Sequence, residues 1–379
     1  MDFWPSDEHA AFQRTVREFA AAEIAPHVEV WDRAGQLPVE LVHAMGDLGL
    51  FGLPFPESVG GGGDFLALCL AIEEIGRVDQ SVGITLSAGV GLGASPIFRF
   101  GTEEQRKRWL PDLLAGRALA AFGLTEPDAG SDAGATRTRA TADGDEWVLN
   151  GAKAFITNSG TPMTSLITVT ARGDDGAISC FIVPSGTPGL TVMPPLRKLG
   201  WHASDTHDLM LEDCRVPSGA LLGERGAGFK NFLSILDDGR IAISALAVGC
   251  AQACLDHSVA YAKERSAFGG PIGRFQAIAF SLADLAVEVE NARTLTYKAA
   301  ACKQSGKPFR QLAAMAKLYS TEAAVSATRV ATQVFGGAGF MEESPVARFY
   351  RDAKILEIGE GTSEIQRLVI SRGLGLPVA

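Results

Sequence analysis

The sequence lacks the spacings that hold metal ions or disulfide frameworks. Its six cysteines include no Cys-x-x-Cys pair, and its six histidines include no His-Glu-x-x-His pair. We therefore expect buried free thiols in a reducing compartment and no metal site. The chain also has no Gly-x-Gly-x-x-Gly turn in a βαβ unit, which disfavours a nicotinamide-dependent dehydrogenase.

Basic residues are also in short supply. The 34 lysines and arginines are outnumbered by 44 aspartates and glutamates, which gives a net charge of −10. Nucleic acid is therefore not an expected partner, because phosphate binding needs a basic surface. The acidic N-terminus has no targeting pattern, and we expect no apolar run of membrane-spanning length. The sequence predicts a cytoplasmic protein, with a matured mitochondrial matrix protein as the second choice and no integral membrane segment.

Three regions with different patterns follow one another along the 379 residues. Residues 1–117 are predicted to form a helical domain, with a cap at Ser6, a helix end at Pro26 and a capping box at Thr102-Glu-Glu-Gln105. The helices of this region are expected near 39–49 and 65–77, on either side of a glycine loop at 60–63. This length suits two or three domains rather than one core.

The second region, 118–225, is rich in valine, isoleucine and threonine between turn signals, and is predicted to be a small β domain. Strands are expected at 119–125, 146–149, 165–171, 178–183, 190–193 and 207–211. The third region, 226–379, is predicted to be a helical bundle because apolar residues recur at helical spacing. Its long antiparallel helices are expected at 227–264, 275–304 and 309–335.

One loop near the C-terminus carries a candidate catalytic carboxylate. Glu360 stands between Gly359 and Gly361, and Thr362 or Ser363 can cap the helix that follows. Such a loop can present one acid to a cleft among backbone N–H groups. An ordinary turn with a solvated glutamate is the alternative.

Three stretches together resemble the acyl-CoA dehydrogenase family. They are Phe122-Gly-Leu-Thr-Glu-Pro-Asp-Ala-Gly-Ser-Asp-Ala-Gly-Ala135, then Gln333-Val-Phe-Gly-Gly-Ala-Gly-Phe340 with Glu343, Arg348 and Asp352, and then Gly359-Glu-Gly-Thr-Ser-Glu-Ile-Gln366. The order of segments agrees over essentially the whole chain.

The resemblance implies an α+β multidomain fold with an N-terminal helical domain, a middle β-barrel-like domain and a C-terminal four-helix bundle. It implies FAD as cofactor, a homotetramer, and oxidation of an acyl-CoA substrate to the trans-2-enoyl-CoA. It also implies an electron-transfer flavoprotein as the acceptor. A flavin oxidase or monooxygenase on the same fold, and a non-catalytic assembly factor, are the alternatives.

By resemblance Glu360 is the base that removes the α proton, and its backbone N–H helps to hold the thioester oxygen. A desolvated glutamate has a raised pKa, which suits this task. Some family members carry the base on a helix of the C-terminal domain, where this chain has Gly239. A glycine inside a helix costs about 1 kcal/mol relative to alanine, so a structural reason for Gly239 is expected.

The resemblance also implies ligand contacts along the chain, and in the family some of those in the segments 265–276 and 333–337 reach the FAD of a neighbouring subunit. Those to FAD are Phe122, Leu124, Thr125, Gly130, Ser131, Phe155, Thr157, Arg265, Phe268, Gln276, Gln333, Gly336, Gly337, Thr362 and Glu364. Those to substrate are Ser131, Asp237, Arg240 and Gly361. Four of these residues have plainer interpretations: a core aromatic for Phe155, a surface charge for Arg265, and a helix-surface ion pair for Asp237 with Arg240. The stretch 122–131 could likewise be a β-strand followed by a glycine-rich turn with a capping serine.

Two departures from the family pattern and one small-residue stretch affect the ligand sites. Phe155 stands where the family usually has tryptophan, and Gly359 stands where tyrosine is common. Residues 87–94 are unusually small and correspond to the bottom of the acyl pocket in the family. The small residues at 87–94 predict a pocket that lacks a side-chain floor and admits longer or branched acyl groups. Gly359 removes a bulky wall beside the substrate, and Phe155 changes the environment of the flavin.

Overall fold

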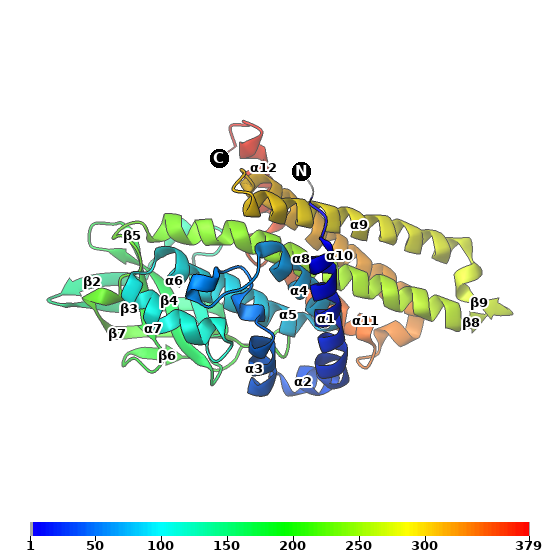
Figure 1. Ribbon diagram of the computed structural model, residues 1–379, viewed down its shortest axis with the longest axis horizontal. Coiled ribbons are helices and arrows are strands. Elements are labelled where there is room, and N and C mark those ends of the chain that lie inside the picture. The colour runs from blue at the N-terminus through cyan, green and yellow to red at the C-terminus, as the bar shows by residue number, and fades with distance from the viewer. Residues whose placement is uncertain (1–2, 379) are drawn as a thin grey trace.

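The computed structural model describes residues 3–378, so the first two residues of the acidic N-terminus lie outside the described chain. The molecule is elongated, with a β-sheet at one end and a helical hairpin reaching the other (Figure 1). Helices precede the sheet along the chain and follow it, as the sequence predicts. The helices before and after the sheet pack into one large apolar core, whereas the sheet has a smaller core of its own.

The first region contains seven α-helices. They are α1 (Asp7–Phe19), α2 (Val28–Ala34), α3 (Val39–Asp47), α4 (Phe65–Val78), α5 (Gln80–Ala88), α6 (Ser95–Phe100) and α7 (Glu103–Leu114). The predicted capping box of α7 is confirmed, because Thr102 and Gln105 exchange hydrogen bonds. The predicted end of the first helical run at Pro26 is confirmed to within two residues, because the run continues from α1 through a π-helical turn (Ala20–Ile24). Pro26 lies in the short 3-10 turn (Ala25–His27) that follows and leads into α2.

One helical stretch contradicts the expectation that no apolar run reaches membrane-spanning length. Gln80–Phe100 comprises α5, a π-helical turn (Gly89–Ala94) and α6, and is long and apolar enough to cross a membrane by composition. However, 78% of its apolar window is buried inside the protein. Burial on this scale is what a core helix needs, so length and hydropathy alone do not make it a membrane segment.

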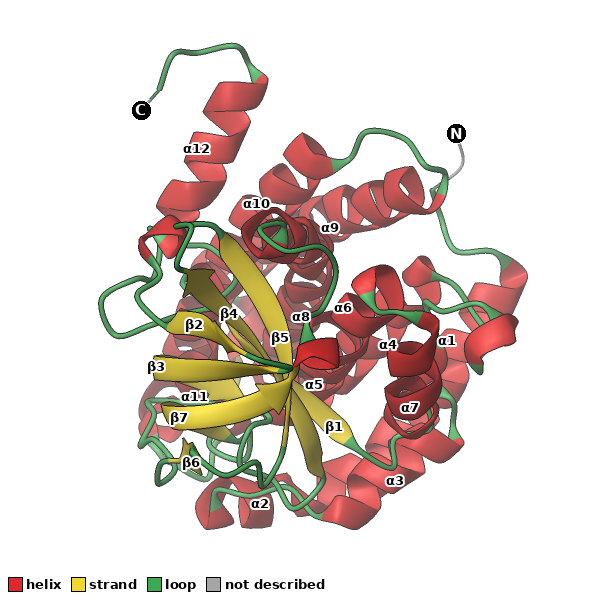
Figure 2. Cartoon of the chain, turned by 90° about the vertical axis from the view of Figure 1, so that its left-hand side faces the viewer, coloured by secondary structure: helices red, strands yellow, loops and turns green. Residues whose placement is uncertain are grey.

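The middle region forms a mixed seven-stranded sheet in the order β1-β4-β2-β3-β7-β6, with β5 paired to β4 (Figure 2). The strands are β1 (Leu119–Gly123), β2 (Arg139–Asp143), β3 (Glu146–Thr157), β4 (Thr164–Gly173), β5 (Ile178–Pro184), β6 (Leu190–Val192) and β7 (Thr206–Pro217). All six predicted strands are present. The sequence does not predict β2, because the strand has no alternation of large apolar and polar residues. In the structure only one of its five residues is buried.

The third region is dominated by three long helices. They are α8 (Gly228–Glu264), α9 (Gln276–Gln304) and α10 (Arg310–Phe335), within a few residues of the prediction. Two shorter helices, α11 (Pro345–Ala353) and α12 (Ser363–Gly373), complete the chain. At a rise of about 1.5 Å per residue, the 37 residues of α8 span roughly 55 Å. Figure 1 shows α8 running from the sheet to the small hairpin of β8 (Ser266–Ala267) and β9 (Gly270–Pro271) at the opposite end.

Candidate active site

The Glu360 loop connects a 3-10 turn (Lys354–Glu357) to α12. Thr362 caps α12, because its hydroxyl accepts a hydrogen bond from the backbone N–H of Ile365 at 3.3 Å. Glu360 and Gly361 both have left-handed backbone angles, with φ of 52° and 97°. Glycine adopts this region freely, but for a glutamate it costs on the order of 1–3 kcal/mol. The surrounding contacts therefore hold Glu360 in a conformation that the isolated chain would avoid.

Gly239 of α8 lies directly against the Glu360 carboxylate. A Cβ atom added at Gly239 would come within 1.7 Å of Glu360 Oε2. Glu360 as a residue is only half-buried, but Oε2 is shielded from solvent and has no hydrogen-bond partner among the described residues. The glycine in the middle of α8 is thus explained: it leaves the space that the carboxylate occupies.

The environment of the carboxylate changes its acidity. Burial raises the pKa of Glu360 to about 7, while the positive charges of Lys317 and Arg240 oppose the rise and Asp238 adds to it. Burial likewise lowers the pKa of Lys317 to about 8, against the attraction of Glu360 and Glu357. The expected raised pKa is therefore present, and burial is its main cause.

Two proposed substrate-side residues form an ion pair next to this carboxylate. Arg240 Nη1 lies 2.5 Å from Asp237 Oδ1, one turn away on α8. Arg240 is only 4% exposed, so the pair is buried rather than on the helix surface. Burial lowers the pKa of Arg240, while Asp237 opposes that change.

The first predicted flavin-facing segment leaves β1 beside the N-terminal part of α8. The Phe122 ring stacks on Phe232 with 3.9 Å between centroids, and Phe232 precedes Gly239 by about two turns. The side chains of Phe122 and Leu124 are buried, whereas Thr125 is half-buried and Ser131, with Gly130, is exposed. Thr125 and Ser131 are therefore the members whose side chains are open to a ligand.

The second predicted flavin-facing segment is the end of β3. Phe155 is 67% exposed and has a left-handed backbone with φ of 61°. Asp208 supports this conformation by accepting a hydrogen bond from the Phe155 backbone N–H at 3.0 Å. The interpretation of Phe155 as a core aromatic is wrong, because its ring lies on the surface of this chain. Thr157 is half-buried next to it.

A buried ion pair beneath these segments was not predicted. Lys153 Nζ lies 2.7 Å from Glu126 Oε1 and 3.1 Å from Thr170 Oγ1, and neither charged side chain is exposed. Glu126 also accepts hydrogen bonds from the backbone N–H groups of Arg137 and Thr138. Glu126 belongs to the recognised motif, but no local pattern shows that Lys153 faces inward on β3. The pair ties β3 to the loop that carries Thr125.

Among the other predicted FAD contacts, Thr362 and the exposed Glu364 lie at the start of α12, whereas six residues lie at the far end of the bundle. These six are Arg265, Phe268, Gln276, Gln333, Gly336 and Gly337. Arg265 follows Gly239 by 26 residues (265 minus 239), about 39 Å along α8. The stacked rings of Tyr261 and Phe335, 4.1 Å apart, place the end of α10 there too. A single chain therefore does not bring the two groups of predicted contacts together.

The far-end residues are open to a partner. The Phe268 ring is 89% exposed, and a Cβ atom added at Gly337 would meet no other atom within 4 Å. The side chains of Arg265, Gln276 and Gln333 are exposed and have no hydrogen-bond or ion-pair partner among residues 3–378. Within this chain Arg265 is a surface charge, which agrees with the plainer interpretation. However, no oppositely charged side chain among residues 3–378 pairs with it.

The small residues at 87–94 leave less space than their sizes suggest. A Cβ atom at Gly89 would meet the Phe51 ring at 2.8 Å, and one at Gly93 would meet the Ala120 carbonyl oxygen at 2.9 Å. Only Gly91 faces open space, with no other atom within 4 Å. Two of these glycines thus serve close packing rather than an open pocket floor.

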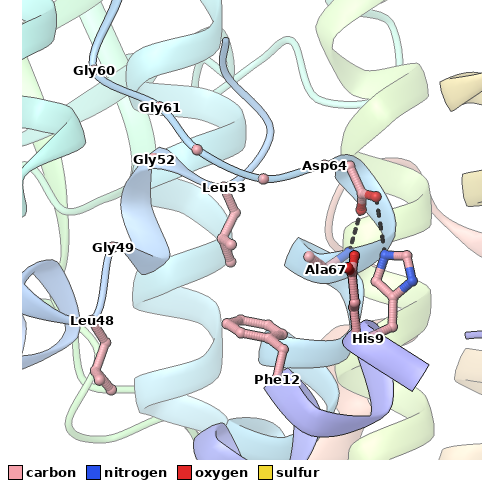
Figure 3. Close-up of a pocket in the computed structure, with 13 residues that line it drawn as sticks. His9, Phe12, Leu48, Gly49, Gly52, Leu53, Gly60, Gly61, Asp64 and Ala67 are labelled. Atoms are coloured by element: carbon pink, nitrogen blue, oxygen red, sulfur yellow. Dashed lines mark hydrogen bonds and ion pairs between the residues drawn. The ribbon is translucent and has the colours of Figure 1, made fainter. Parts of the chain in front are cut away.

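A separate cavity of about 490 Å³ lies among the N-terminal helices (Figure 3). Phe12 and Leu53 line it, and the glycine loop at 60–63 forms one rim. Asp64 caps α4 at this rim by accepting a hydrogen bond from Ala67 at 2.8 Å, and it pairs with His9 at 3.0 Å. The cavity shares no lining residue with the Glu360 site, so it does not belong to that site.

Comparison with known proteins identifies relatives along the whole chain. Family models for the N-terminal, middle and C-terminal domains of acyl-CoA dehydrogenases match residues 6–117, 121–214 and 226–375. The chain is 52% identical to the probable acyl-CoA dehydrogenase YngJ of Bacillus subtilis, over 99% of this chain and 100% of the relative. It is 47% identical to the mitochondrial short-chain specific acyl-CoA dehydrogenase of Bos taurus, over 96% and 89%.

Solved structures agree with these relatives. Butyryl-CoA dehydrogenase from Megasphaera elsdenii superposes with a TM-score of 0.95 at 45% identity, covering 99% of this chain and 100% of that one. A glutaryl-CoA dehydrogenase from Mycobacterium smegmatis in complex with FADH2 gives a TM-score of 0.93 at 33% identity, with coverage of 97% and 95%. A chain in the structure "Electron transferring flavoprotein of Acidaminococcus fermentans: Towards a mechanism of flavin-based electron bifurcation" gives 0.95 at 44%, with 99% of both covered. The chain therefore belongs to the acyl-CoA dehydrogenase family of oxidoreductases, as its motifs indicated.

Proposed function

We propose that this chain catalyses the FAD-dependent α,β-dehydrogenation of an acyl-CoA thioester to the trans-2-enoyl-CoA, with Glu360 as the base. The observation that carries the assignment of the base is the buried, unpartnered Oε2 atom of Glu360 above Gly239. Because its pKa is about 7, this carboxyl group is partly ionised near neutral pH and can both take and hold a proton. A positioned carboxylate base typically contributes about 10²–10⁴-fold to such a step.

The loop also offers a donor for the thioester oxygen. Among residues 3–378 the backbone N–H of Glu360 makes no hydrogen bond. A donor aimed at the oxyanion that develops as the α proton leaves contributes on the order of 3 kcal/mol. Glu360 would therefore take the proton through its carboxylate and stabilise the resulting negative charge through its N–H. FAD, when bound, supplies the acceptor for the β hydride.

The residues present fit FAD, provided that two chains share each site. Thr125, Ser131 and Phe155 would hold the ring system near Glu360, together with Thr157 and the α12 N-terminus. Arginine pairs well with phosphate, and Phe268 offers an exposed face for stacking on adenine. Because Arg265 at the end of α8 and Phe268 just beyond it lie too far away to reach the same FAD as Glu360, they would serve the FAD of a neighbouring subunit.

An assembly of several copies follows from this sharing. The family resemblance favours a homotetramer. The exposed face of α9 supports further contacts between copies, because Phe280 and Val287 are each 61% exposed there. We also propose domain boundaries of 1–117, 118–225 and 226–379, which lie close to the ranges matched by the family models.

We propose a short-chain acyl-CoA as substrate. The Megasphaera elsdenii protein is a butyryl-CoA dehydrogenase, and the Bos taurus relative is short-chain specific. The expectation of longer or branched acyl groups loses most of its structural basis, because Gly89 and Gly93 are packed against Phe51 and Ala120. An electron-transfer flavoprotein is the proposed acceptor, by resemblance and by the Acidaminococcus structure. A cytoplasmic location stays a prediction.

Anaerobic bleaching of the flavin by a panel of acyl-CoAs from C4 to C16 tests the proposal. Wild-type protein should be bleached fastest by the short members. The Glu360→Gln variant should keep its yellow FAD and lose bleaching by at least about 10²-fold. Near-normal bleaching of that variant would rule out Glu360 as the base, and rapid reoxidation of the reduced enzyme–product complex by O₂ would favour the oxidase alternative.

A further inference from the structure

A lysine buried in the middle of α10 lies under the Glu360 loop. Lys317 is 0% exposed, and its Nζ donates a hydrogen bond to the Gly361 carbonyl oxygen at 2.8 Å. A buried ammonium group costs several kcal/mol unless a partner compensates it. Within residues 3–378 this carbonyl is its only hydrogen-bond partner, and no carboxylate lies within ion-pair distance of it.

The other charges around Glu360 are already paired. On α8, Arg240 pairs with Asp237, and Asp238 lies 3.3 Å from Arg99 and 3.1 Å from Lys303.

The nearby acidic residues of α10 and of the 3-10 turn before the loop also have basic partners. On α10, Glu322 pairs with Arg367 at 2.7 Å, and in the 3-10 turn Glu357 pairs with Lys354. Lys317 is therefore the one charge facing the loop from the described parts of these elements that lacks an oppositely charged partner.

We propose that Lys317 is a positioning residue for the base: its ammonium group fixes the Gly361 carbonyl and supplies the uncompensated positive charge that stabilises ionised Glu360. This inference rests on the proposed role of Glu360. The positive charge of Lys317 is the largest of the charge effects on the Glu360 carboxyl and lowers its pKa, against the rise caused by burial. Because burial raises the pKa of Glu360 to about 7 and lowers that of Lys317 to about 8, the charged forms of both groups coexist near neutral pH.

The helix α12 that follows the loop contains a matched control for the charge. Gln366 is also buried, and its Nε2 donates to the same Gly361 oxygen at the same distance, 2.8 Å. Gln366 also donates to the Glu360 carbonyl at 3.3 Å. Lys317 and Gln366 therefore share one acceptor and differ in charge. Loss of either should loosen the loop, but only loss of Lys317 should change the ionisation of the base.

The test compares pH profiles of anaerobic flavin reduction by butyryl-CoA in the holoenzyme and in four variants. In Lys317→Met and Lys317→Gln, the acidic limb should move to higher pH by on the order of one unit, because a positive charge has been removed. Lys317→Arg should restore most of the wild-type midpoint. Gln366→Met should slow reduction without moving the midpoint.

A second measurement does not depend on turnover. Acetoacetyl-CoA has an acidic α proton but no β hydride to transfer, so its bound enolate absorbance reports proton transfer to the base alone. The pH at which half of the bound ligand is enolate should rise in the two neutral Lys317 variants and stay unchanged in Gln366→Met. Equal midpoints in wild type and both neutral Lys317 variants would overturn the inference. Failure of the proposed function is distinguishable, because it would appear as normal flavin reduction in Glu360→Gln.

Discussion

One added methyl group should separate activity from stability in this protein. In Gly239→Ala the new Cβ would lie 1.7 Å from Glu360 Oε2, so the carboxylate has to move. Oε2 is the far end of a flexible side chain, and a displaced rotamer costs about 0.5–1.5 kcal/mol. Replacing glycine by alanine inside a helix returns about 1 kcal/mol. These two terms nearly cancel, so the free energy of unfolding should change little.

Catalysis should respond very differently. A displacement of about 1 Å in a catalytic group can cost roughly 10²-fold in rate. We therefore expect Gly239→Ala to retain FAD and its urea unfolding midpoint while the rate of anaerobic flavin reduction by butyryl-CoA falls by about 10²-fold or more. Stopped-flow absorbance measures the rate, and the flavin spectrum of the purified protein reports retention.

Gly359→Ala provides the control. It also adds one methyl group beside Glu360, but its Cβ would meet only the Ile355 carbonyl oxygen, at an ordinary contact distance of 3.4 Å. Its rate should stay within a few-fold of wild type. If Gly239→Ala reduced its flavin as fast as Gly359→Ala, the carboxylate seen above Gly239 would not be the base.

Three further changes have distinct expected outcomes. Lys153→Met leaves the Glu126 carboxylate buried without its cation and should cost about 3–5 kcal/mol in urea unfolding, and adding Glu126→Gln should recover much of that loss. Burial raises the pKa of Asp352 to about 7 from an ordinary value of 3.8, so the folded protein keeps a proton that the unfolded chain releases between these pH values. Stability should therefore fall as pH rises from about 4 to 7, by up to about 1.4 kcal/mol per pH unit, and Asp352→Asn should flatten that slope. Gly359→Tyr should fold, because its Cβ position is open apart from the Ile355 oxygen, and should narrow the range of acyl chains in a kcat/KM series.

Regular periodicity made the long helices predictable. The spacing around Ile278 and Leu282 placed α9 to within one residue at each end, because a long amphipathic pattern has few competing interpretations. The sequence predicts that Gly239 has a structural reason but does not show what it is. The atom that requires a glycine there, Oε2 of Glu360, is 121 residues away in sequence (360 minus 239). No feature of the sequence predicts that Lys317 is buried beneath the Glu360 loop. In an alanine-rich helix, a lysine is ordinarily read as solvent-exposed, and its burial depends on a loop that packs from elsewhere.

The sequence alone does not show which of the predicted FAD contacts lie near Glu360 and which lie far from it. The structure separates them into two groups because α8 is a rigid rod between the sheet and the β8–β9 hairpin (Figure 1). The family resemblance predicts that some of these contacts reach the FAD of a neighbouring subunit, but it does not show that they are the ones separated from Glu360 by the length of α8. That assignment depends on the length of a helix, which becomes a physical distance only once the fold is known.

The length of α8 has a genetic consequence. If each FAD lies beside Glu360 of one chain and is held by Arg265 of another, two defective alleles can complement each other. Co-expressed Glu360→Gln and Arg265→Ala chains would form mixed pairs in which one site carries both lesions and the other carries neither. Such mixtures should recover activity that neither variant has alone, and the same geometry would let one defective allele impair sites formed with a normal copy.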